Sequence, residues 1–263
     1  MLYRIRKDLV NQIRSPKLWI GLLIGLAGYF VQLANLLKLV RGSEYGVNIF
    51  ETYALGSTNS WAMTASVAGL VFALSDMPYL SPFEMNAIYR SSKRRRITEK
   101  FLFSAVCTAV YFVLQFAMTV IITLPISFTE NAWSFFSFAI SGAAKSSFSP
   151  AAAALFSLFL NFMYGLMLIS ILFFLSLLLD KGIAFAVILT FQAIQHFLMV
   201  RLPQFSYFCL FRNSILNYHG QISKELIVHL LIEFAVICAA LAASVAIRNK
   251  ISYDVRQEEN NLL

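Results

Sequence analysis

Polar residues recur at helical spacing inside the last two apolar segments of the chain. Gln192, Gln195 and His196 stand at positions i, i+3 and i+4, and His229 and Glu233 stand four residues apart. Each group therefore shares one face of a helix. Polar groups are costly inside a membrane, which marks these five as candidate functional residues. Three kinds of chemistry suit them: hydrogen bonds between two helices, the lining of a translocation route, or a metal site of two histidines and a glutamate.

The two polar groups also lie at similar depths. With a rise of about 1.5 Å per residue, His196 lies about 6 Å and Gln192 about 12 Å from the outer end of their segment. On the same scale His229 lies about 5 Å and Glu233 about 11 Å from the outer end of theirs. We expect them to stand level in the outer leaflet. Their spacing matches no metal motif, and the other two interpretations stay open.

Motifs for enzymatic chemistry are absent from the sequence. It contains no HExxH, no GxSxG and no phosphate-binding G-x-x-x-x-G-K-[ST] loop. The three cysteines are scattered through apolar segments and show no metal-ligand spacing. We therefore predict that the chain is not an enzyme, binds no metal or other cofactor, and does not itself hydrolyse ATP.

The composition indicates which elements carry these residues. Of the 263 residues, 59% are hydrophobic and only 13% are charged, whereas soluble domains carry about 25% charged residues. A soluble core cannot hide that excess of apolar surface, so lipid must cover it. The net charge of +8 then reports on membrane topology, and we expect no nucleic-acid partner.

Six segments approach the ~20 apolar residues that a membrane-spanning helix needs. They are Trp19–Leu37, a segment within Thr52–Ser75, Phe101–Leu124, Ala153–Leu179, Gly182–Val200 and Leu226–Ile247. The second is the weakest, because Ser57 to Ser60 interrupt it with polar residues. The sequence predicts an all-α integral membrane protein with six transmembrane helices in a single domain, residues 1–263.

The distribution of lysine and arginine sets the predicted orientation. With the N-terminus inside, fifteen basic residues fall on the cytoplasmic side and six on the outside. Cytoplasmic segments are the ones enriched in these residues. We predict a multi-pass protein of the cell (plasma) membrane with both termini in the cytoplasm. The tail, residues 248–263, is polar, and we expect it to be frayed.

Residues 2–14 predict an amphipathic helix lying in the inner membrane interface. One stripe of it is apolar, formed by Leu2, Ile5, Leu9 and Ile13. The basic residues assigned to the interface are Arg4, Arg6, Lys7 and Arg14. Such a helix binds anionic headgroups through its cations. The alternative is a simple determinant of topology.

The segment after the second span predicts a short cytoplasmic helix. Ser81-x-x-Glu84 is a capping box, and Pro82 suits the first helical position. The helix should run to about Arg90, with a basic run following, so that the whole element covers residues 82–96. Its exposed apolar and basic side chains fit docking onto another protein; the residues assigned are Phe83, Glu84, Ile88, Arg90, Arg94, Arg95 and Arg96. The alternative is a capped turn whose arginines bind lipid phosphate.

Two further segments fall on the predicted outer side. Residues 125–152 contain the apolar stretch Ala132–Ala144, which we interpret as interfacial or re-entrant. Residues 201–224 combine basic residues with several aromatic ones, which favours a short, partly buried element before the last span.

This order of elements resembles the membrane subunits of ABC-2-type exporters, with a type V exporter-like fold. The resemblance covers essentially the whole chain: an amphipathic helix ending in Arg14-Ser15-Pro16-Lys17, six spans, and a short helix plus basic run over Ser81–Lys100. It rests on architecture and segment lengths. One departure is Asp76-Met77-Pro78-Tyr79, which stands where many members carry a more acidic stretch.

The resemblance implies a mechanism. Two permease subunits, identical or paralogous, form the pathway, and each docks a cytoplasmic ABC ATPase that holds the ATP and Mg²⁺. Pro82–Arg90 maps onto the family's coupling helix and residues 2–14 onto its interfacial helix. The implied cargo is hydrophobic or amphipathic: a peptide, antimicrobial or lipid.

Two other classes compete with this interpretation. One is a six-span substrate-capture subunit of an importer, although such subunits lack a strong basic helix between spans two and three. The other is a non-transporting membrane protein, such as an immunity or assembly factor. Copurification with an ATP-binding subunit separates the exporter from the second class.

Overall fold

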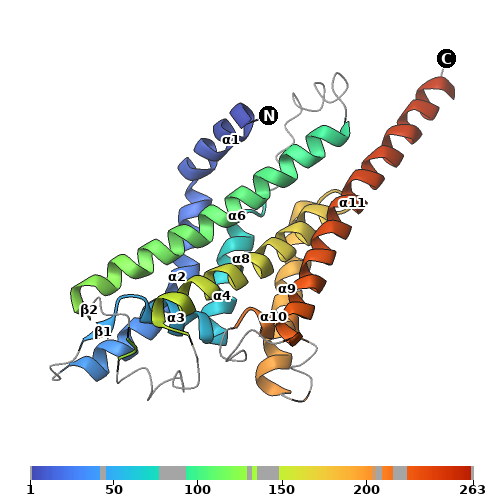
Figure 1. Cartoon of the computed structure of the whole chain (residues 1–263). Helices are drawn as coiled ribbons and strands as arrows, with labels where there is room; N and C mark the ends of the chain where they lie inside the picture. The colour runs from blue at the N-terminus through green and yellow to red at the C-terminus, as the bar shows by residue number, and fades with distance from the viewer. Residues whose placement is uncertain are drawn as a thin grey trace.

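The computed structural model describes residues 2–41, 46–76, 93–128, 132–134, 148–202, 204, 209–215 and 224–261 (Figure 1). Most of these residues are helical. In chain order the elements are α1 (Leu2–Arg14), α2 (Pro16–Val40), β1 (Val47–Asn48), α3 (Glu51–Thr58), α4 (Ser60–Ala73), α6 (Lys93–Thr123), the 3-10 turn η1 (Leu124–Ile126), β2 (Ser127–Phe128), α8 (Pro150–Leu175), α9 (Lys181–Arg201), α10 (Leu210–Asn213) and α11 (Lys224–Asn261).

Five helices are long and apolar enough to cross a membrane: α2, α6, α8, α9 and the first part of α11. Each exceeds the ~20 residues that a spanning helix requires. The chain is therefore a multi-pass membrane protein of the all-α class. The predicted spans that fall on these helices are Trp19–Leu37, Phe101–Leu124, Ala153–Leu179, Gly182–Val200 and Leu226–Ile247.

The predicted second span is a broken helix. The eight-residue α3 ends at Thr58, and the 14-residue α4 begins at Ser60 in a new direction. Asn59 lowers the free-energy cost of the break, because it caps the N-terminus of α4. Its side-chain oxygen accepts hydrogen bonds from the backbone N–H groups of Trp61 (2.9 Å) and Ala62 (3.1 Å). At about 1.5 Å per residue α4 is about 21 Å long, short of the ~30 Å hydrocarbon layer. Among the described residues the predicted second span is therefore not one continuous spanning helix, and the break falls at its polar interruption.

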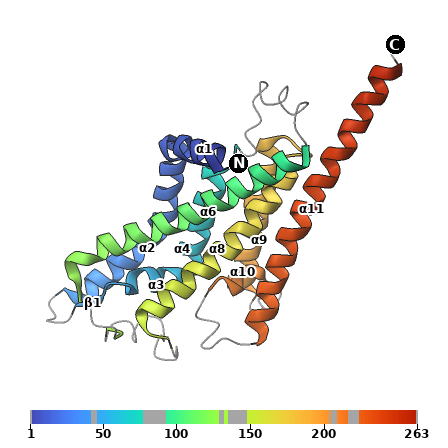
Figure 2. The same cartoon turned by 45° about the horizontal axis from the view of Figure 1, so that its top comes forward.

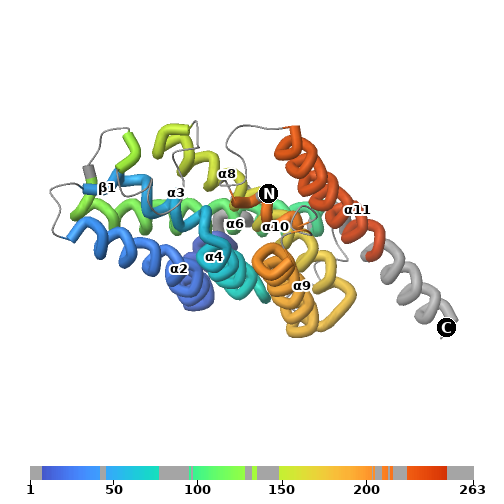
Figure 3. The backbone as a smooth tube through the Cα atoms, turned by 90° about the horizontal axis from the view of Figure 1, so that it is seen from below, coloured from blue at the N-terminus to red at the C-terminus, as the bar shows by residue number. Residues whose placement is uncertain are grey.

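The long helices form two rows, seen along the bundle in Figure 3. One row contains α2, α4 and α9, with α4 packed on both neighbours. The other contains α6, α8 and α11, with α8 in the middle. The central helices of the two rows, α4 and α8, also contact each other. The two rows also meet where α2 packs on α6 and where α9 packs on α8.

The bundle has two distinct ends (Figure 1). At the end that we call the terminal face lie α1, the last turns of α11, the start of α6 and the start of α9. At the opposite end, the sheet face, lie α3, α10 and a minimal parallel sheet. In that sheet Val47 pairs with Ser127 and Asn48 with Phe128.

Glycines allow α2 and α4 to approach closely. Gly21 and Gly25 stand four residues apart on α2, the spacing by which membrane helices bring their backbones together. A Cβ atom added to Gly69 of α4 would lie 2.1 Å from the carbonyl oxygen of Gly21. Tyr111 of α6 closes the junction, because its hydroxyl donates to the carbonyl oxygens of Gly21 (3.1 Å) and Ser66 (2.9 Å).

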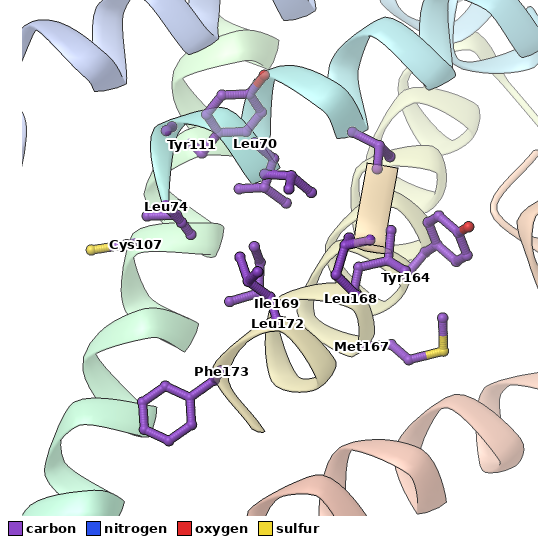
Figure 4. Close-up of a cluster of buried hydrophobic side chains, with 14 of the residues drawn as sticks. Leu70, Leu74, Cys107, Tyr111, Tyr164, Met167, Leu168, Ile169, Leu172 and Phe173 are labelled. Atoms are coloured by element: carbon purple, nitrogen blue, oxygen red, sulfur yellow. The ribbon is translucent and has the colours of Figure 1, made fainter. Parts of the chain in front are cut away.

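The largest apolar cluster lies between α4, α6 and α8 (Figure 4). Leu70, Tyr111 and Leu172 are all fully buried in it. Outward faces of the helices are apolar as well: Leu23 of α2 is 64% exposed and Leu231 of α11 is 62% exposed. In a membrane protein these faces contact lipid.

The last helix is longer than predicted. Residues 248–263 were expected to fray, but α11 continues unbroken to Asn261. No glycine or proline occurs between Lys224 and Asn261, so nothing in the sequence stops the helix. Its final turns project from the terminal face (Figure 2).

Candidate functional site

The buried face of α9 carries two of the predicted polar residues. Gln192 is 1% exposed and His196 is 8% exposed, and both share this face with Ile188. Gln195 lies beside them and is half-buried. The spacing of the polar residues thus correctly predicts one face of the helix. That face points into the bundle toward α4 and α8, on which α9 packs.

Gln192 binds α8. Its side-chain oxygen accepts a 2.7 Å hydrogen bond from the hydroxyl of Tyr164, a residue that is itself fully buried. The amide nitrogen of Gln192, Nε2, makes no hydrogen bond within the described part of the chain. A buried amide nitrogen without an acceptor costs about 1–3 kcal/mol. The position is therefore a strong candidate for a bound polar group.

His196 binds α4. Its Nδ1 lies 2.8 Å from the Thr64 hydroxyl, and its ring centroid lies 4.2 Å from that of Trp61. The other ring nitrogen, Nε2, makes no hydrogen bond to the described residues. The contacts with Thr64 and Trp61 thus fix the orientation of the His196 ring, and its Nε2 atom can still form a hydrogen bond.

Glu233 approaches the same region from α11. It is 2% exposed and lies on the buried stripe of α11 with Leu226, Ile237 and Ala240, and α8 is the helix against which α11 packs most. No salt bridge to Glu233 is found among the described residues. Tyr164 and Glu233 thus lie on two helices that pack on each other, and Tyr164 is bonded to Gln192 of the third.

His229 lies one turn closer to the sheet face on α11. It is half-buried and interacts electrostatically with Glu225 and Arg212. The described residues contain no group of three metal-ligating side chains that could hold an ion. Hydrogen-bond partners of the α9 residues lie on α4 and α8, so neither Gln192 nor His196 bonds directly to the α11 pair.

The short helix α10 seals the sheet-face side of this region. It packs on α8, α9 and α11. Its Phe211 is fully buried. The ring centroid of Phe211 lies 5.6 Å from that of Tyr164 and 6.3 Å from that of His196. A partly buried element before the last span, expected in residues 201–224, is thus present at Leu210–Asn213. We call Tyr164, Gln192, His196 and Glu233 the α8–α9–α11 cluster.

A second polar centre lies at the sheet face, and sequence reasoning missed it. The Glu51 carboxylate is completely buried and accepts hydrogen bonds from the backbone N–H and hydroxyl of Ser134, the latter at 2.7 Å, and from the backbone N–H of Asn48 at 3.2 Å. These bonds tie the start of α3 to residues 132–134. The signal in the sequence that could have indicated this centre is Glu51 itself, an acidic residue directly before an apolar segment.

A third polar group links α2, α3 and α8. The Tyr29 hydroxyl lies 3.2 Å from that of Ser57, and the Asn161 side chain reaches the hydroxyls of Tyr53 and Ser57 at 3.2 and 3.3 Å. The rings of Tyr29 and Tyr53 stack with centroids 5.3 Å apart. All these side chains are buried, and their mutual bonds indicate a structural junction.

At the terminal face, α1 is fastened to two other helices. Asp8 accepts a 3.1 Å hydrogen bond from Lys100 of α6, and the Gln12 side chain donates to the carbonyl oxygen of Ala73 at the end of α4 (2.9 Å). Asp76, which follows α4, forms a salt bridge with Lys17 of α2. Asp76, which precedes residues 77–92, is thereby joined to α2, and α6, which follows them, is joined to α1.

The docking residues assigned from the sequence are only partly within the described structure. Phe83, Glu84, Ile88 and Arg90 lie outside the described residues, as does the helix Pro82–Arg90 itself. Arg94 and Arg96 belong to the first turn of α6, and their side chains also lie outside the description. Arg95 is exposed and forms an i, i+4 salt bridge with Glu99 (3.2 Å).

The predicted interfacial residues fall on α1, which forms a helix over the expected range. The side chains of Arg4, Arg6 and Lys7 are outside the described part, and that of Arg14 is exposed. The apolar stripe of α1 is described only from Leu9 onward, where Leu9 is half-buried and Ile13 exposed. The interfacial position of α1 stays a prediction.

Comparisons with known proteins give no relative for this chain. No family model matches it, no curated protein matches it in sequence, and no solved structure matches it in fold.

Proposed function

We propose that this chain is the transmembrane subunit of an ATP-driven exporter of the ABC-2 type. It would form the translocation pathway with a second permease subunit and couple to separate cytoplasmic ATPase subunits. The multi-pass helical fold and the N-terminal helix preceding the first span support this proposal. The excess of lysine and arginine at the terminal face supports a cytoplasmic position for that face.

The observation that carries the proposal is the fastening of α1 at the terminal face. A partner that pulls on residues 82–96 pulls on the end of α4 and the start of α6, because the segment joins them. The same pull reaches α1 through Lys100–Asp8 and through Gln12. The motion is thus shared by α1, α4 and α6, as a coupling device requires.

The ion pairs at the terminal face are weak enough to let the helices move relative to one another. Lys100 and Asp8 are 19% and 34% exposed at their side chains, and Lys17 and Asp76 are about 40% exposed. Partly exposed ion pairs contribute about 0–1 kcal/mol each. They fix the relative positions of the helices without locking them.

The pathway itself is assigned to the last two spans. Its lining residues are Gln192, Gln195, His196, His229 and Glu233. Their surroundings are apolar, since Phe211 and Met199 are buried nearby. A cargo with a polar end and an apolar body, such as a hydrophobic or amphipathic peptide, antimicrobial or lipid, suits that lining.

The test is whether an ATP-binding subunit accompanies the chain. The tagged chain is solubilised in mild detergent together with the products of its chromosomal neighbours, and the copurifying proteins are identified. An ATPase subunit in stoichiometric amount supports the proposal. Purification of the chain without any nucleotide-binding protein, in several detergents, would favour an assembly or immunity factor.

A further inference from the structure

The α8–α9–α11 cluster contains more hydrogen-bonding capacity than the chain uses. Glu233 is 2% exposed and has no salt bridge in the part of the chain that the structure describes. The Nε2 atoms of Gln192 and His196 make no hydrogen bond there either. Buried polar groups in native proteins are normally paired. Three such groups, on two helices that both pack on α8, therefore offer hydrogen-bonding capacity to a bound molecule.

The chemistry of the three groups defines the missing partner. A carboxyl group that is buried without a counter-ion stays in its neutral form, because an unpaired charge in a low-dielectric interior is very costly; ionised Glu233 therefore requires a cation beside it. The Gln192 Nε2 atom is a donor only, so it requires an acceptor such as a carbonyl oxygen. The His196 Nε2 atom can either donate or accept. The buried neighbours Phe211 and Ile237 are apolar.

We propose that the cluster binds the aminoacyl end of an amphipathic molecule. Its primary ammonium pairs with Glu233, its carbonyl oxygen accepts from Gln192, and its apolar body packs on the surrounding helices. An aminophospholipid fits less well, because its phosphate would bring a second negative charge close to Glu233. That this ligand is cargo rests on the proposed function, whereas its binding does not.

The experiment measures binding to the purified full chain in neutral detergent by calorimetry, with empty micelles subtracted. The probes are leucine octylamide, which carries the ammonium, and the octylamide of 2-hydroxy-4-methylpentanoic acid, in which a neutral hydroxyl of similar size replaces the ammonium. We expect the charged probe to bind about tenfold more tightly, the usual worth of one charge-assisted hydrogen bond. Equal affinity of the two probes for the wild-type chain would refute the proposal without any variant.

Variants locate the site. Glu233→Gln should abolish the preference for the charged probe, while Glu225→Gln, an exposed acid two turns away on the same helix, should keep it. Retained preference in Glu233→Gln places the charge recognition elsewhere and overturns the assignment. Glu233→Asp, which conserves the charge, should keep the preference and shows that a loss in Glu233→Gln is not simple misfolding.

Two further arms separate the remaining possibilities. Added phosphatidylethanolamine should not displace leucine octylamide; full displacement would mean that the site takes a lipid headgroup and would overturn the aminoacyl assignment. Binding is measured without any ATPase subunit. A chain that selects the charged probe but has no ATPase partner therefore refutes the proposed function alone, and a chain with such a partner but no selectivity refutes this inference alone.

Discussion

Gly69 tests how the two N-terminal membrane helices are held together. An alanine Cβ at this position would lie 2.1 Å from the Gly21 carbonyl oxygen, 2.6 Å from the Tyr111 hydroxyl and 2.9 Å from the Gly25 nitrogen. Two of these atoms belong to the backbone of α2, so a side-chain rotation cannot relieve the contact. Gly69→Ala must push α2 and α4 apart.

The expected cost follows from three terms. Overpacking a tight site costs about 1–3 kcal/mol, and displacing the Tyr111 hydroxyl from the Gly21 oxygen costs about 1 kcal/mol more. The better helix propensity of alanine returns about 1 kcal/mol. We therefore expect a net loss of about 2 kcal/mol in the free energy of unfolding, which lowers Tm by about 4–8 °C for a chain of this size.

The assay is the fraction of monodisperse protein that survives heating in detergent, measured by size-exclusion chromatography. Gly182→Ala is the matched control, because no heavy atom lies within 4 Å of its added Cβ. We expect that variant to melt at or slightly above the wild-type temperature. A Gly69→Ala protein that melts with Gly182→Ala would refute the close packing of α2 on α4.

Three further predictions concern single contacts. Tyr164→Phe leaves the buried side-chain oxygen of Gln192 without its donor and should cost about 1–3 kcal/mol in the same heating assay; an unchanged Tm would contradict the bond. Asn59→Ala removes the cap of α4 and should cost about 1 kcal/mol, whereas Asn59→Asp should lose far less; equal losses would speak against capping. Lys100→Glu should release α1 and speed its proteolysis, and the double exchange with Asp8→Lys should restore protection; a double variant cleaved as fast as Lys100→Glu would show that the pair does not hold α1.

The sequence predicts the long helices well, because each contains about 20 apolar residues and little else. The second span shows where that reasoning fails. Its apolar length was sufficient, but Asn59 satisfies the backbone of a new helix and the chain turns there. Whether a polar residue interrupts a helix or is tolerated within it depends on which N–H groups its side chain reaches, and composition does not reveal this.

The sequence predicts which helix face carries the polar residues of the candidate site, but it does not predict their hydrogen-bond partners. The spacing of Gln192 and His196 correctly places both on one buried face. Their partners, Tyr164 and Thr64, are ordinary residues in apolar helices and carry no signal of their own. Glu51 was missed because Ser134, which donates two of its three hydrogen bonds, lies far away in the sequence.

The proposed exporter function requires that the predicted element at residues 82–96 couple ATP hydrolysis to transport. The complex with its ATPase is compared in proteoliposomes as wild type, as Phe83→Asp, and with Arg94, Arg95 and Arg96 reversed in charge. Arg41→Glu, an exposed position at the sheet face, is the control. We expect both altered complexes to lose ATP-driven transport and Arg41→Glu to retain it. Transport at the wild-type rate in both altered complexes would contradict the proposed exporter function.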